Sequence, residues 1–430
     1  MIPLVWDEIA GLELGRLERG DDVGGAITGI KADSRLVGPG DLFVALNTGV
    51  DFVADARRNG AATLVPDDQH AALATLAALV RGKSAARVVA VVGSTGKTTT
   101  KDILGAICAA AVPTVFSEAS LNNEIGVPLT VCRLEPDTEV LVVEMGMRGL
   151  GQIAELCAIA RPDVAVITSI GPEHLELVES VENVARANAE VLEALPPNGV
   201  AVVPTADAAP ALLPFLTRAD VVLRPFDPRR VEVTEGVAVF ALEDATVALR
   251  LPYARRSLVE NTYAALLAYE ALGLPLDRLQ QGIDEIRLSP WRGEGIALPG
   301  GGLVVNDAYN ANPTSMRAAL VDLAERAGAR RKVAILGEMA ELGSSAERYH
   351  REIGELVAET VDVLVAVGEP ARAYMLPGVA EMLWLERALG LDDAILRAVV
   401  RSGDVVLVKA SRAVGLEGIP AALAKIAQTW

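Results

Sequence analysis

The sequence predicts an α/β protein of three domains, in which parallel sheets make up the middle and the end of the chain. The chain has 430 residues, and 51% of them are hydrophobic, so sizeable cores can form. From residue 87 onward, short apolar runs alternate with helix-compatible segments, which is the pattern of a doubly wound parallel sheet. A glycine-rich loop follows the first of these runs. We expect a small α/β domain at 1–84, a parallel-sheet domain at 85–299 and a Rossmann-like domain at 300–430.

Short strands and one or two helices are expected in the first 84 residues. A strand from Asp41 to Leu46 follows the turn Gly38-Pro39-Gly40, and a helix covers Leu73 to Val80. The stretch Gly82-Lys83-Ser84 has the composition of a linker to the next domain.

The middle domain is expected to contain a parallel sheet. Its strands are predicted at Val88–Val92, Glu139–Val143, Val164–Thr168 and Val200–Val203. The segment 221–251 alternates with turns, which predicts antiparallel strands appended to that sheet. A helix is expected at Leu258–Leu272.

Strands and helices alternate again in the last 130 residues. The strands are predicted at Leu303–Asn306, Val333–Leu336, Val363–Val367 and Val405–Val408. This pattern indicates a second doubly wound unit of Rossmann type, although the dinucleotide fingerprint G-x-G-x-x-G is not found in it.

The stretch from Val88 to Asp102 reads VVAVVGSTGKTTTKD and predicts a strand, a loop and a helix that together bind a polyphosphate. The backbone N–H groups of the loop would hold the phosphates, the lysine would reach the β/γ-phosphates, and the first threonine would ligate Mg²⁺. A glycine-rich turn with a surface lysine is the alternative, and Val91 stands where a strict phosphate loop has its first glycine. The flanking strand and helix favour the phosphate site, whose residues are Gly93, Ser94, Thr95, Gly96, Lys97, Thr98 and Thr99.

Two further polar residues follow predicted strands at the same edge of the sheet. Glu144 ends a very apolar strand, where a carboxylate is costly without a partner such as a cation. His174 follows the next strand in TSIGPEHLE and is one of three histidines. In doubly wound sheets the ligand crevice lies at the carboxyl ends of the strands. We therefore expect both residues to contact Mg²⁺ or phosphate; a hydrogen-bonded glutamate and a structural histidine are the alternatives.

Three features at the end of the middle domain and in the last domain supply further candidate site residues. Arg292 lies between two predicted domains and fits a guanidinium that clamps phosphate, or else a linker arginine. The segment NDAYNANPTSM (306–316) joins a strand to a helix, where turn and N-cap chemistry would also explain its asparagines. Lys409 ends the last strand, an unusual place for a lysine.

Composition limits the partners and the compartment. The formal net charge is −18, which disfavours nucleic acid and anionic membranes because phosphate backbones need a basic surface. The three cysteines form no C-x-x-C motif and are expected to be reduced core residues. The N-terminus lacks the basic region of a signal peptide, and the apolar stretch 71–80 is far too short to span a membrane. We expect a soluble, cytoplasmic protein without membrane insertion.

Taken together, these motifs resemble those of the Mur ligases, ATP-dependent enzymes that form amides in the synthesis of peptidoglycan precursors. The resemblance covers nearly the whole chain. It rests on the segments DSRLVGPGDLFVAL (33–46), GSTGKTTTKD, LNNEIGVPLT (121–130), EMGMRGLGQI (144–153), NDAYNANPTSMRAAL, LGEMAELG (336–343) and VLVKASR. The forms GKTTTKD, YNANP and GEMAELG look like the dipeptide-adding member of the family, and the D-N-P-R motif of the tripeptide-forming member is not found.

The resemblance implies ATP and Mg²⁺ as cofactors. It implies that Lys97 and its loop hold the ATP phosphates and that Thr98 and Glu144 bind Mg²⁺, with His174 at a second Mg²⁺. It also implies that Asn261 of ENTYAAL contacts the adenine of ATP, that Arg292 contacts the γ-phosphate, and that Asp307 lies near the ribose.

The resemblance also implies UDP-N-acetylmuramoyl-tripeptide (UDP-MurNAc-tripeptide) and D-alanyl-D-alanine (D-Ala-D-Ala) as substrates. Ser34 and Arg35 match the UDP-binding end of the first domain, and Asn123 and Glu124 lie in the segment near the muramoyl-peptide. The other implied site residues are Tyr309, Asn310 and Asn312 for substrate and Lys409 for catalysis.

Three positions depart from the family pattern. Asn188 in Ala187-Asn188-Ala189-Glu190 replaces a lysine that is normally carbamylated and supplies a carboxylate to Mg²⁺. Asn188 cannot form the carbamate, so we predict that its amide replaces it at the second metal, directly or through water. Ser257 stands where a histidine is usual, and the segment 48–52 reads TGVDF in place of D-G-H-x-F, so the UDP-sugar contacts are expected to be reduced or rearranged.

The reaction that the resemblance implies begins when a peptide carboxylate attacks the γ-phosphate of ATP. The resulting acyl-phosphate then reacts with the amine of the dipeptide, and domain closure would exclude water. Two alternatives remain: another ligase of the superfamily, such as one that adds glutamate to folates or a different cell-wall amino acid, and a non-catalytic P-loop nucleotide switch. A nicotinamide-binding protein fits less well, and we expect a monomer.

Overall fold

The computed structural model describes residues 1–20, 24–205, 207–227, 231–253 and 255–429. By their contacts these residues form two compact units. Unit 1 comprises 1–168, 187–254 and 259–287, and unit 2 comprises 169–186, 255–258 and 288–430. The expected boundaries at 84 and 299 stay a prediction.

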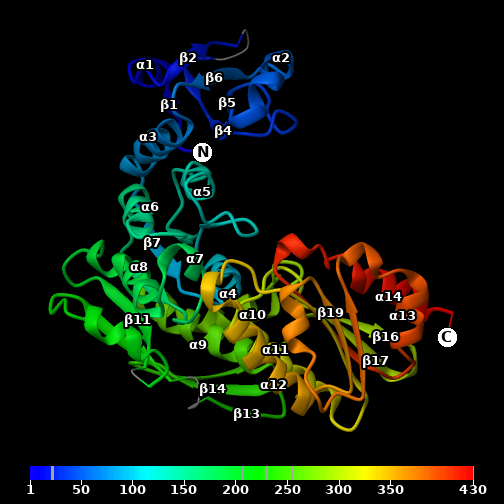
Figure 1. The fold of residues 1–430 in the computed structure, drawn as a ribbon. Helices are drawn as coiled ribbons and strands as arrows, with labels where there is room; N and C mark the ends of the chain where they lie inside the picture. Colours follow the sequence, from blue (N-terminus) through cyan, green and yellow to red (C-terminus); the bar gives the residue numbers. More distant parts are fainter. Residues whose placement is uncertain (21–23, 206, 228–230, 254, 430) are drawn as a thin grey trace. The chain divides into compact units, whose positions relative to one another are not determined.

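The first 84 residues of unit 1 form a small sheet with helices beside it (Figure 1). In the strand order β2-β6-β5-β4, β2 is antiparallel to β6 and the other pairs are parallel. The expected strand at 41–46 and helix at 73–80 are confirmed as β5 and α3. The strands are β2 (Gly15–Glu18), β4 (Gly29–Lys31), β5 (Asp41–Val44), β6 (Ala62–Pro66) and the separate antiparallel pair β1 (Leu4–Val5) and β3 (Ala26–Ile27); the α-helices are α1 (Trp6–Ala10), α2 (Val53–Arg58) and α3 (Gln69–Gly82).

A second, wholly parallel sheet of unit 1 has the strand order β12-β11-β10-β7-β9-β8. It consists of β7 (Arg87–Val92), β8 (Thr114–Phe116), β9 (Val140–Glu144), β10 (Val164–Ile167), β11 (Val200–Pro204) and β12 (Val222–Phe226). The chain builds β8 and β9 on one side of β7 and then crosses to build β10 on the other. The carboxyl end of β7 is therefore a topological switch point, which is where doubly wound sheets bind ligands.

Helices connect or follow the strands of this sheet. They are α4 (Lys97–Ala109), α5 (Gly126–Val131), α6 (Gln152–Ala160), α8 (Val181–Glu193), α9 (Arg256–Ala271) and α10 (Leu279–Asp284). Helix α9 confirms the expected helix at 258–272 within two residues at its start and one at its end.

The expectation for 221–251 was partly wrong. Strand β12 joins the sheet in parallel to β11, with Val200 opposite Val222. The antiparallel strands form a separate sheet of β13 (Glu232–Thr234), β14 (Val237–Ala241) and β15 (Thr246–Arg250). Strand β12 lies at the edge of the sheet and is largely exposed, so its sequence pattern resembles that of an exposed hairpin strand.

Unit 2 contains a further sheet with the order β16-β17-β21-β18-β19-β20, in which β16 is antiparallel to β17 and the other neighbours are parallel. Four of its strands confirm the expected ones, and the sequence analysis did not predict β16 and β20. The strands are β16 (Glu294–Leu298), β17 (Gly302–Asn306), β18 (Lys332–Gly337), β19 (Val363–Val367), β20 (Glu381–Leu385) and β21 (Val405–Lys409); the helices are α7 (Leu175–Val178), α11 (Pro313–Ala327), α12 (Ala346–Thr360), α13 (Asp393–Val399) and α14 (Ile419–Ala427).

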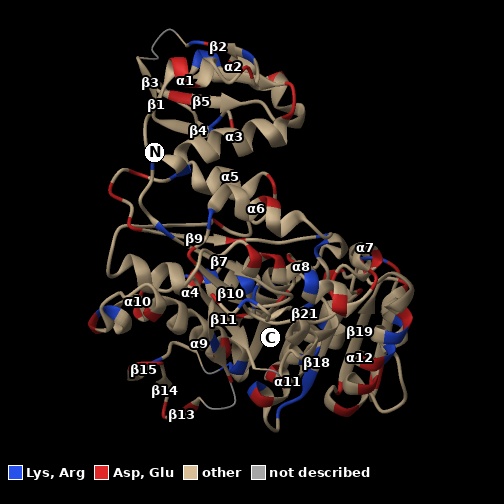
Figure 2. Ribbon diagram, turned by 90° about the vertical axis from the view of Figure 1, so that its left-hand side faces the viewer, with Lys and Arg blue, Asp and Glu red and all other residues tan. Residues whose placement is uncertain are grey.

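The predicted class, α/β with parallel sheets, is confirmed. Lys, Arg, Asp and Glu positions are distributed over many helices and loops rather than gathered on one element (Figure 2). The three cysteines are free and buried, as expected, and burial raises the pKa of Cys132 and of Cys157 to about 12. Among the described residues, no helix has the length and hydropathy needed to cross a membrane.

Candidate active site

The glycine-rich loop joins the end of β7 to the first residue of α4, as the sequence predicts. Gly96 has a φ of 85° and caps the helix, and a Cβ atom there would lie 2.4 Å from Oδ1 of Asn261. Only glycine therefore allows Asn261 to pack against this loop. On the other side, the hydroxyl of Thr168 donates to the carbonyl oxygen of Thr95 at 2.6 Å. The loop is thus held in place while the N–H groups at the start of α4 face the position of an anion.

Glu144 ends β9, the neighbour of β7, and its side chain is only 1% exposed. Its Oε1 accepts a hydrogen bond from Nδ2 of Asn122 at 2.7 Å. Its Oε2 is buried and accepts no hydrogen bond from the described part of the chain. A buried carboxylate oxygen without a donor is costly unless a cation neutralises it. The Glu144 side chain therefore fits a Mg²⁺ ligand.

Thr98 lies in the first turn of α4, where its hydroxyl is 3.2 Å from the hydroxyl of Ser120. Both Ser120 and Asn122 belong to the segment after β8, which we call the 117–122 loop. Two of the residues in this loop thus contact the two candidate metal ligands of unit 1, Thr98 and Glu144.

Lys101 holds this loop. Its side chain is 1% exposed, and its ammonium donates to the carbonyl oxygens of Ser117 at 2.8 Å and Ala119 at 2.9 Å and to the carboxylate of Asp102. A buried ammonium needs such acceptors because its desolvation is expensive. Lys101 and Asn122 were not among the predicted site residues, although both lie within the motifs that were singled out.

The structure gives less support to the predicted second Mg²⁺ site, which includes Asn188. Asn188 lies on α8 and is 2% exposed. Glu190, two positions further along the same helix, accepts hydrogen bonds from the N–H groups of Gly151 and Ala154 at the start of α6. Among the described residues, no group of three His, Cys, Asp or Glu side chains has the arrangement of a metal site. A Mg²⁺ ion that binds a substrate phosphate needs only one or two protein carboxylates, because waters and phosphate oxygens complete its coordination. Glu144 and Thr98 are therefore compatible with Mg²⁺ even without a three-residue cluster.

In unit 2, the strand ends bring Asp307 and Lys409 together, 102 residues apart in the chain. Strands β17 and β21 are parallel neighbours with Asn306 opposite Val408. The ammonium of Lys409 donates to Oδ2 of Asp307 at 2.9 Å and to the carbonyl oxygen of Asn310 at 2.8 Å. Arg255, which sequence reasoning missed, approaches the same Oδ2 at 3.5 Å. Burial lowers the pKa of Lys409, and Asp307 acts against this shift.

Arg292 belongs to the same unit and lies over the ring of Tyr309, with its guanidinium carbon 4.0 Å from the ring centroid. Arg412 lies 5.5 Å from the same centroid and 5.1 Å from that of Trp291. The guanidinium of Arg292 thus lies over an aromatic face, which restricts its orientation.

His174 was expected at the same sheet edge as the glycine-rich loop, and this expectation stays a prediction. By its contacts, the segment 169–186 groups with unit 2. There, Nδ1 of His174 contacts a carboxylate oxygen of Glu341, which lies in the motif LGEMAELG. His174 has a φ of 51° and Glu341 a φ of 61°, so both have left-handed backbones. Glu341 was missed as an individual residue.

The predicted substrate-side residues lie in several places. Arg35 is exposed and pairs with Asp33, and this hydrogen bond lowers the pKa of Asp33 to about 2. Ser34 accepts from Asn59 through its carbonyl oxygen at 3.1 Å. The side chain of Asn123 accepts from the N–H of Gly126, the first residue of α5, at 2.9 Å, and Glu124 lies 4.0 Å from His70.

Asn310 and Asn312 follow β17. Asn310 supplies the carbonyl oxygen that accepts from Lys409, and Asn312 is the N-cap of α11, accepting from the N–H of Ser315 at 2.8 Å. The capping role is the alternative that the sequence already suggested for these asparagines.

Comparison with known proteins identifies two family models in the chain. The Mur ligase middle domain matches residues 91–269, and the Mur ligase glutamate ligase domain matches residues 291–412. The first of these contains the glycine-rich loop and Glu144, and the second contains Arg292, Asp307 and Lys409.

Full-length relatives are also similar. UDP-N-acetylmuramoyl-tripeptide–D-alanyl-D-alanine ligase of Escherichia coli is 32% identical over 98% of this chain and 99% of the relative. The structure of UDP-N-acetylmuramoylalanyl-D-glutamyl-2,6-diaminopimelate–D-alanyl-D-alanyl ligase from Acinetobacter baumannii has a TM-score of 0.78 and 29% identity, covering 98% of both chains. MurF ligase from Thermotoga maritima, in complex with ADP, has a TM-score of 0.80 and 28% identity and covers 93% of this chain and 98% of that one.

Proposed function

Because the chain belongs to the Mur ligase family, we propose that it joins D-alanyl-D-alanine to UDP-N-acetylmuramoyl-tripeptide with conversion of ATP to ADP and phosphate. The observation that carries this proposal is the similarity to a ligase of that name over 98% of this chain and 99% of the relative. A match of this extent includes every domain that the whole reaction uses. A relative in complex with ADP supports ATP as the phosphate donor.

The reaction has two steps, and each needs charge neutralisation more than covalent help from the protein. First, a carboxylate oxygen of the tripeptide attacks the γ-phosphorus, an acyl-phosphate forms, and the bond to the β-phosphate breaks to release ADP. Second, the amine of D-Ala-D-Ala attacks the acyl carbon, phosphate leaves, and the amine loses a proton as the amide forms.

The phosphate loop of unit 1 supports the first step. The N–H groups at the start of α4 and the ammonium of Lys97 hold the phosphates in line with the attacking carboxylate. Gly96 permits the close approach of Asn261, which we assign to the adenine base. Mg²⁺, when bound, supplies positive charge to the phosphate oxygens, and Thr98 and Glu144 would hold it through a hydroxyl and the unpartnered carboxylate oxygen.

The groups of unit 2 have proposed roles of the same kind. Arg292, oriented by Tyr309, is assigned to the γ-phosphate, and Asp307, held by Lys409, is assigned to the ribose. His174 and Asn188 are assigned to a second Mg²⁺, with the neutral amide of Asn188 in place of the usual carbamate.

The test is phosphate release by the purified chain with ATP, Mg²⁺, UDP-MurNAc-tripeptide and D-Ala-D-Ala. We expect release only when both peptide substrates are present, and loss of at least about 100-fold in Lys97→Ala, because one preorganised charge contributes that much. Lys425→Ala, an exposed lysine on α14, is the matched control. Release that is equal without either peptide, or that requires a folate and glutamate, would contradict the proposal. Tight ATP binding without turnover would instead favour a nucleotide switch.

A cytoplasmic, monomeric enzyme stays our prediction. Its soluble nucleotide substrates imply the compartment, and a single light-scattering measurement of the purified chain tests the oligomeric state.

A further inference from the structure

Arg412 of unit 2 is an exposed arginine whose guanidinium lies against two aromatic rings. Its guanidinium carbon is 5.1 Å from the ring centroid of Trp291 and 5.5 Å from that of Tyr309. Among the described residues, no carboxylate pairs with this guanidinium and no oxygen accepts a hydrogen bond from it. The two rings thus restrict the orientation of a cation that has no anionic partner in the described part of the chain.

The backbone on both sides of this contact is fixed. Ser411, directly before Arg412, is 3% exposed. Its hydroxyl accepts from the N–H of Ala340 at 2.8 Å, and its own N–H donates to the carbonyl oxygen of Glu338 at 3.0 Å. Trp291 has a φ of 63°, a left-handed conformation that costs a bulky residue free energy. Strained residues of this kind cluster at functional sites, so the position of the Trp291 ring beside Arg412 points to a ligand.

The other positively charged side chains of this cluster have a partner or an assigned role. Lys409 donates to Asp307 at 2.9 Å, and Arg255 lies 3.5 Å from the same carboxylate. Arg292 is assigned to the γ-phosphate. Of these four cations, Arg412 is the one with neither a carboxylate partner nor a role in the reaction.

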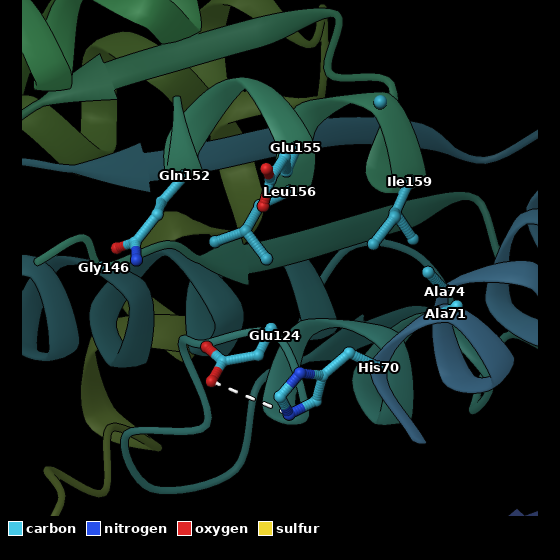
Figure 3. A pocket seen from close by; sticks show the side chains of 10 residues that line it. His70, Ala71, Ala74, Glu124, Gly146, Gln152, Glu155, Leu156 and Ile159 are labelled. Atoms are coloured by element: carbon cyan, nitrogen blue, oxygen red, sulfur yellow. Dashed lines mark ion pairs between the residues drawn. The ribbon is translucent and has the colours of Figure 1, made fainter. Parts of the chain in front are cut away.

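The second substrate, D-Ala-D-Ala, carries one anionic group, its terminal carboxylate. Because the chain has a net charge of −18, this carboxylate needs local positive charge to bind. The cavity of about 550 Å³ in unit 1 does not supply it (Figure 3). Its lining includes Glu124 and Glu155, and none of the described residues that line it is a lysine or an arginine. The dashed line in Figure 3 marks the 4.0 Å contact between Glu124 and His70.

Arg412 fits this carboxylate in both chemistry and position. A guanidinium binds a carboxylate through two parallel hydrogen bonds. The guanidinium carbons of Arg292 and Arg412 lie 4.0 and 5.5 Å from the ring centroid of Tyr309, so their separation is no more than the sum of these distances. An extended dipeptide spans about 7 Å, and a hydrogen bond at each end adds about 3 Å. With its carboxylate at Arg412, the dipeptide can therefore present its amine to an acyl-phosphate held by Arg292.

We propose that Arg412 binds the terminal carboxylate of the incoming dipeptide and so selects dipeptides whose carboxylate is free. The inference rests on the proposed function, in which that dipeptide is the second substrate. Trp291 and Tyr309 are positioning residues for the guanidinium.

The experiment compares D-alanyl-D-alanine with D-alanyl-D-alanine amide, in which a neutral carboxamide of similar size replaces the carboxylate. ATP, Mg²⁺ and UDP-MurNAc-tripeptide are kept saturating. We expect kcat/KM to be at least about tenfold higher for the free carboxylate, mainly through KM, because a hydrogen bond to a charged group contributes that factor. In Arg412→Gln the preference should fall to about twofold or less. In Arg412→Lys, which keeps the charge without the two parallel donors, it should be intermediate.

Arg348→Gln is the matched control, because Arg348 is also exposed and its guanidinium carbon lies 4.4 Å from the ring centroid of Tyr349. This variant should keep the preference for the free carboxylate. Equal kcat/KM for the two dipeptides in the unsubstituted chain would overturn the inference. Equal losses for both dipeptides in Arg412→Gln, or a KM that rises for ATP and not for the dipeptide, would overturn it as well.

Calorimetry with a non-hydrolysable ATP analogue and UDP-MurNAc-tripeptide present separates this inference from the proposed function. Tighter binding of D-Ala-D-Ala than of its amide, lost in Arg412→Gln and kept in Arg348→Gln, supports the role of Arg412 even if no amide bond forms. Amide formation without a preference in either measurement leaves the proposed function intact and overturns the role of Arg412.

Discussion

Two buried lysines, one in each unit, perform the same structural task with different surroundings. Lys101 on α4 is 1% exposed and Lys409 at the end of β21 is 2% exposed. Each donates to one carboxylate and to at least one backbone carbonyl oxygen of a segment that carries candidate site residues. Lys101 thereby fixes the 117–122 loop, and Lys409 fixes the segment from Asp307 to Asn310.

The two lysines differ in whether a second positively charged side chain lies near the carboxylate that accepts from them. Asp307 has Arg255 at 3.5 Å in addition to Lys409, and the positive charges of Arg255 and Arg292 contribute to the lowered pKa of Lys409. Lys101 instead donates to two backbone carbonyl oxygens as well as to the carboxylate of its sequence neighbour Asp102. We infer that Arg255 can partly compensate for the loss of the Lys409 ammonium at Asp307. We infer no such compensation for the Lys101 ammonium in the 117–122 loop.

The largest effect is expected for Lys101→Met. This change leaves a buried carboxylate and two buried carbonyl oxygens without their ammonium donor, so the free energy of unfolding of unit 1 should fall by about 3–5 kcal/mol. Urea denaturation measures it, and hydrogen exchange should increase first in residues 117–122. The exposed Lys425→Met is the control, with a change within about 0.5 kcal/mol.

Lys409→Met should destabilise unit 2 by less, about 1–3 kcal/mol, because Arg255 remains near Asp307. The same denaturation experiment measures this change. A loss as large as that of Lys101→Met would show that Arg255 does not substitute for Lys409 at Asp307.

Asn122→Ala tests whether the loop held by Lys101 serves the metal. The change removes the 2.7 Å donor to Oε1 of Glu144, which would orient this proposed metal ligand. We expect the Mg²⁺ concentration for half-maximal activity to rise about 10- to 100-fold, with little change in stability. Asn59→Ala, whose side chain donates to the carbonyl oxygen of Ser34, is the control. An unchanged Mg²⁺ requirement in Asn122→Ala would contradict the assignment of Glu144.

The smallest effect concerns His350, a buried base in unit 2. Its Nε2 accepts from the N–H of Met339 at 3.0 Å, and Nδ1 lies 2.7 Å from the carbonyl oxygen of Ala346, so the neutral ring is required. Burial lowers the pKa of His350 below its usual 6.5. Its contribution to stability is therefore complete above pH 6.5 and is lost as the pH falls through the lowered pKa.

Denaturation midpoints measured between neutral and acidic pH test this sign. His350→Gln should show a shallower loss of stability with acid than the unsubstituted chain, since the titrating group is gone. Parallel pH profiles for the two proteins would mean that other groups account for the acid sensitivity.

Local features of the site were predictable from the sequence. The phosphate loop was predicted residue by residue because strand, glycine turn and helix N-terminus are adjacent in the chain, and each restricts its own backbone. Glu144 was identified because a carboxylate at the end of an apolar strand needs a partner, and its unpartnered Oε2 agrees with that reasoning. Apolar β-branched runs placed most of the parallel strands for the same local reason.

By itself, then, the sequence determined the α/β class, the glycine-rich loop between β7 and α4, and the residues that carry the family resemblance, because these depend on neighbours in the chain. The tertiary structure alone decided which distant residues meet. Strand order brings Asp307 and Lys409 together across 102 positions, and carbonyl oxygens of the 117–122 loop accept hydrogen bonds from the ammonium of Lys101. No periodicity or motif reports such contacts, since they follow from how strands pair and helices pack and not from local backbone preference.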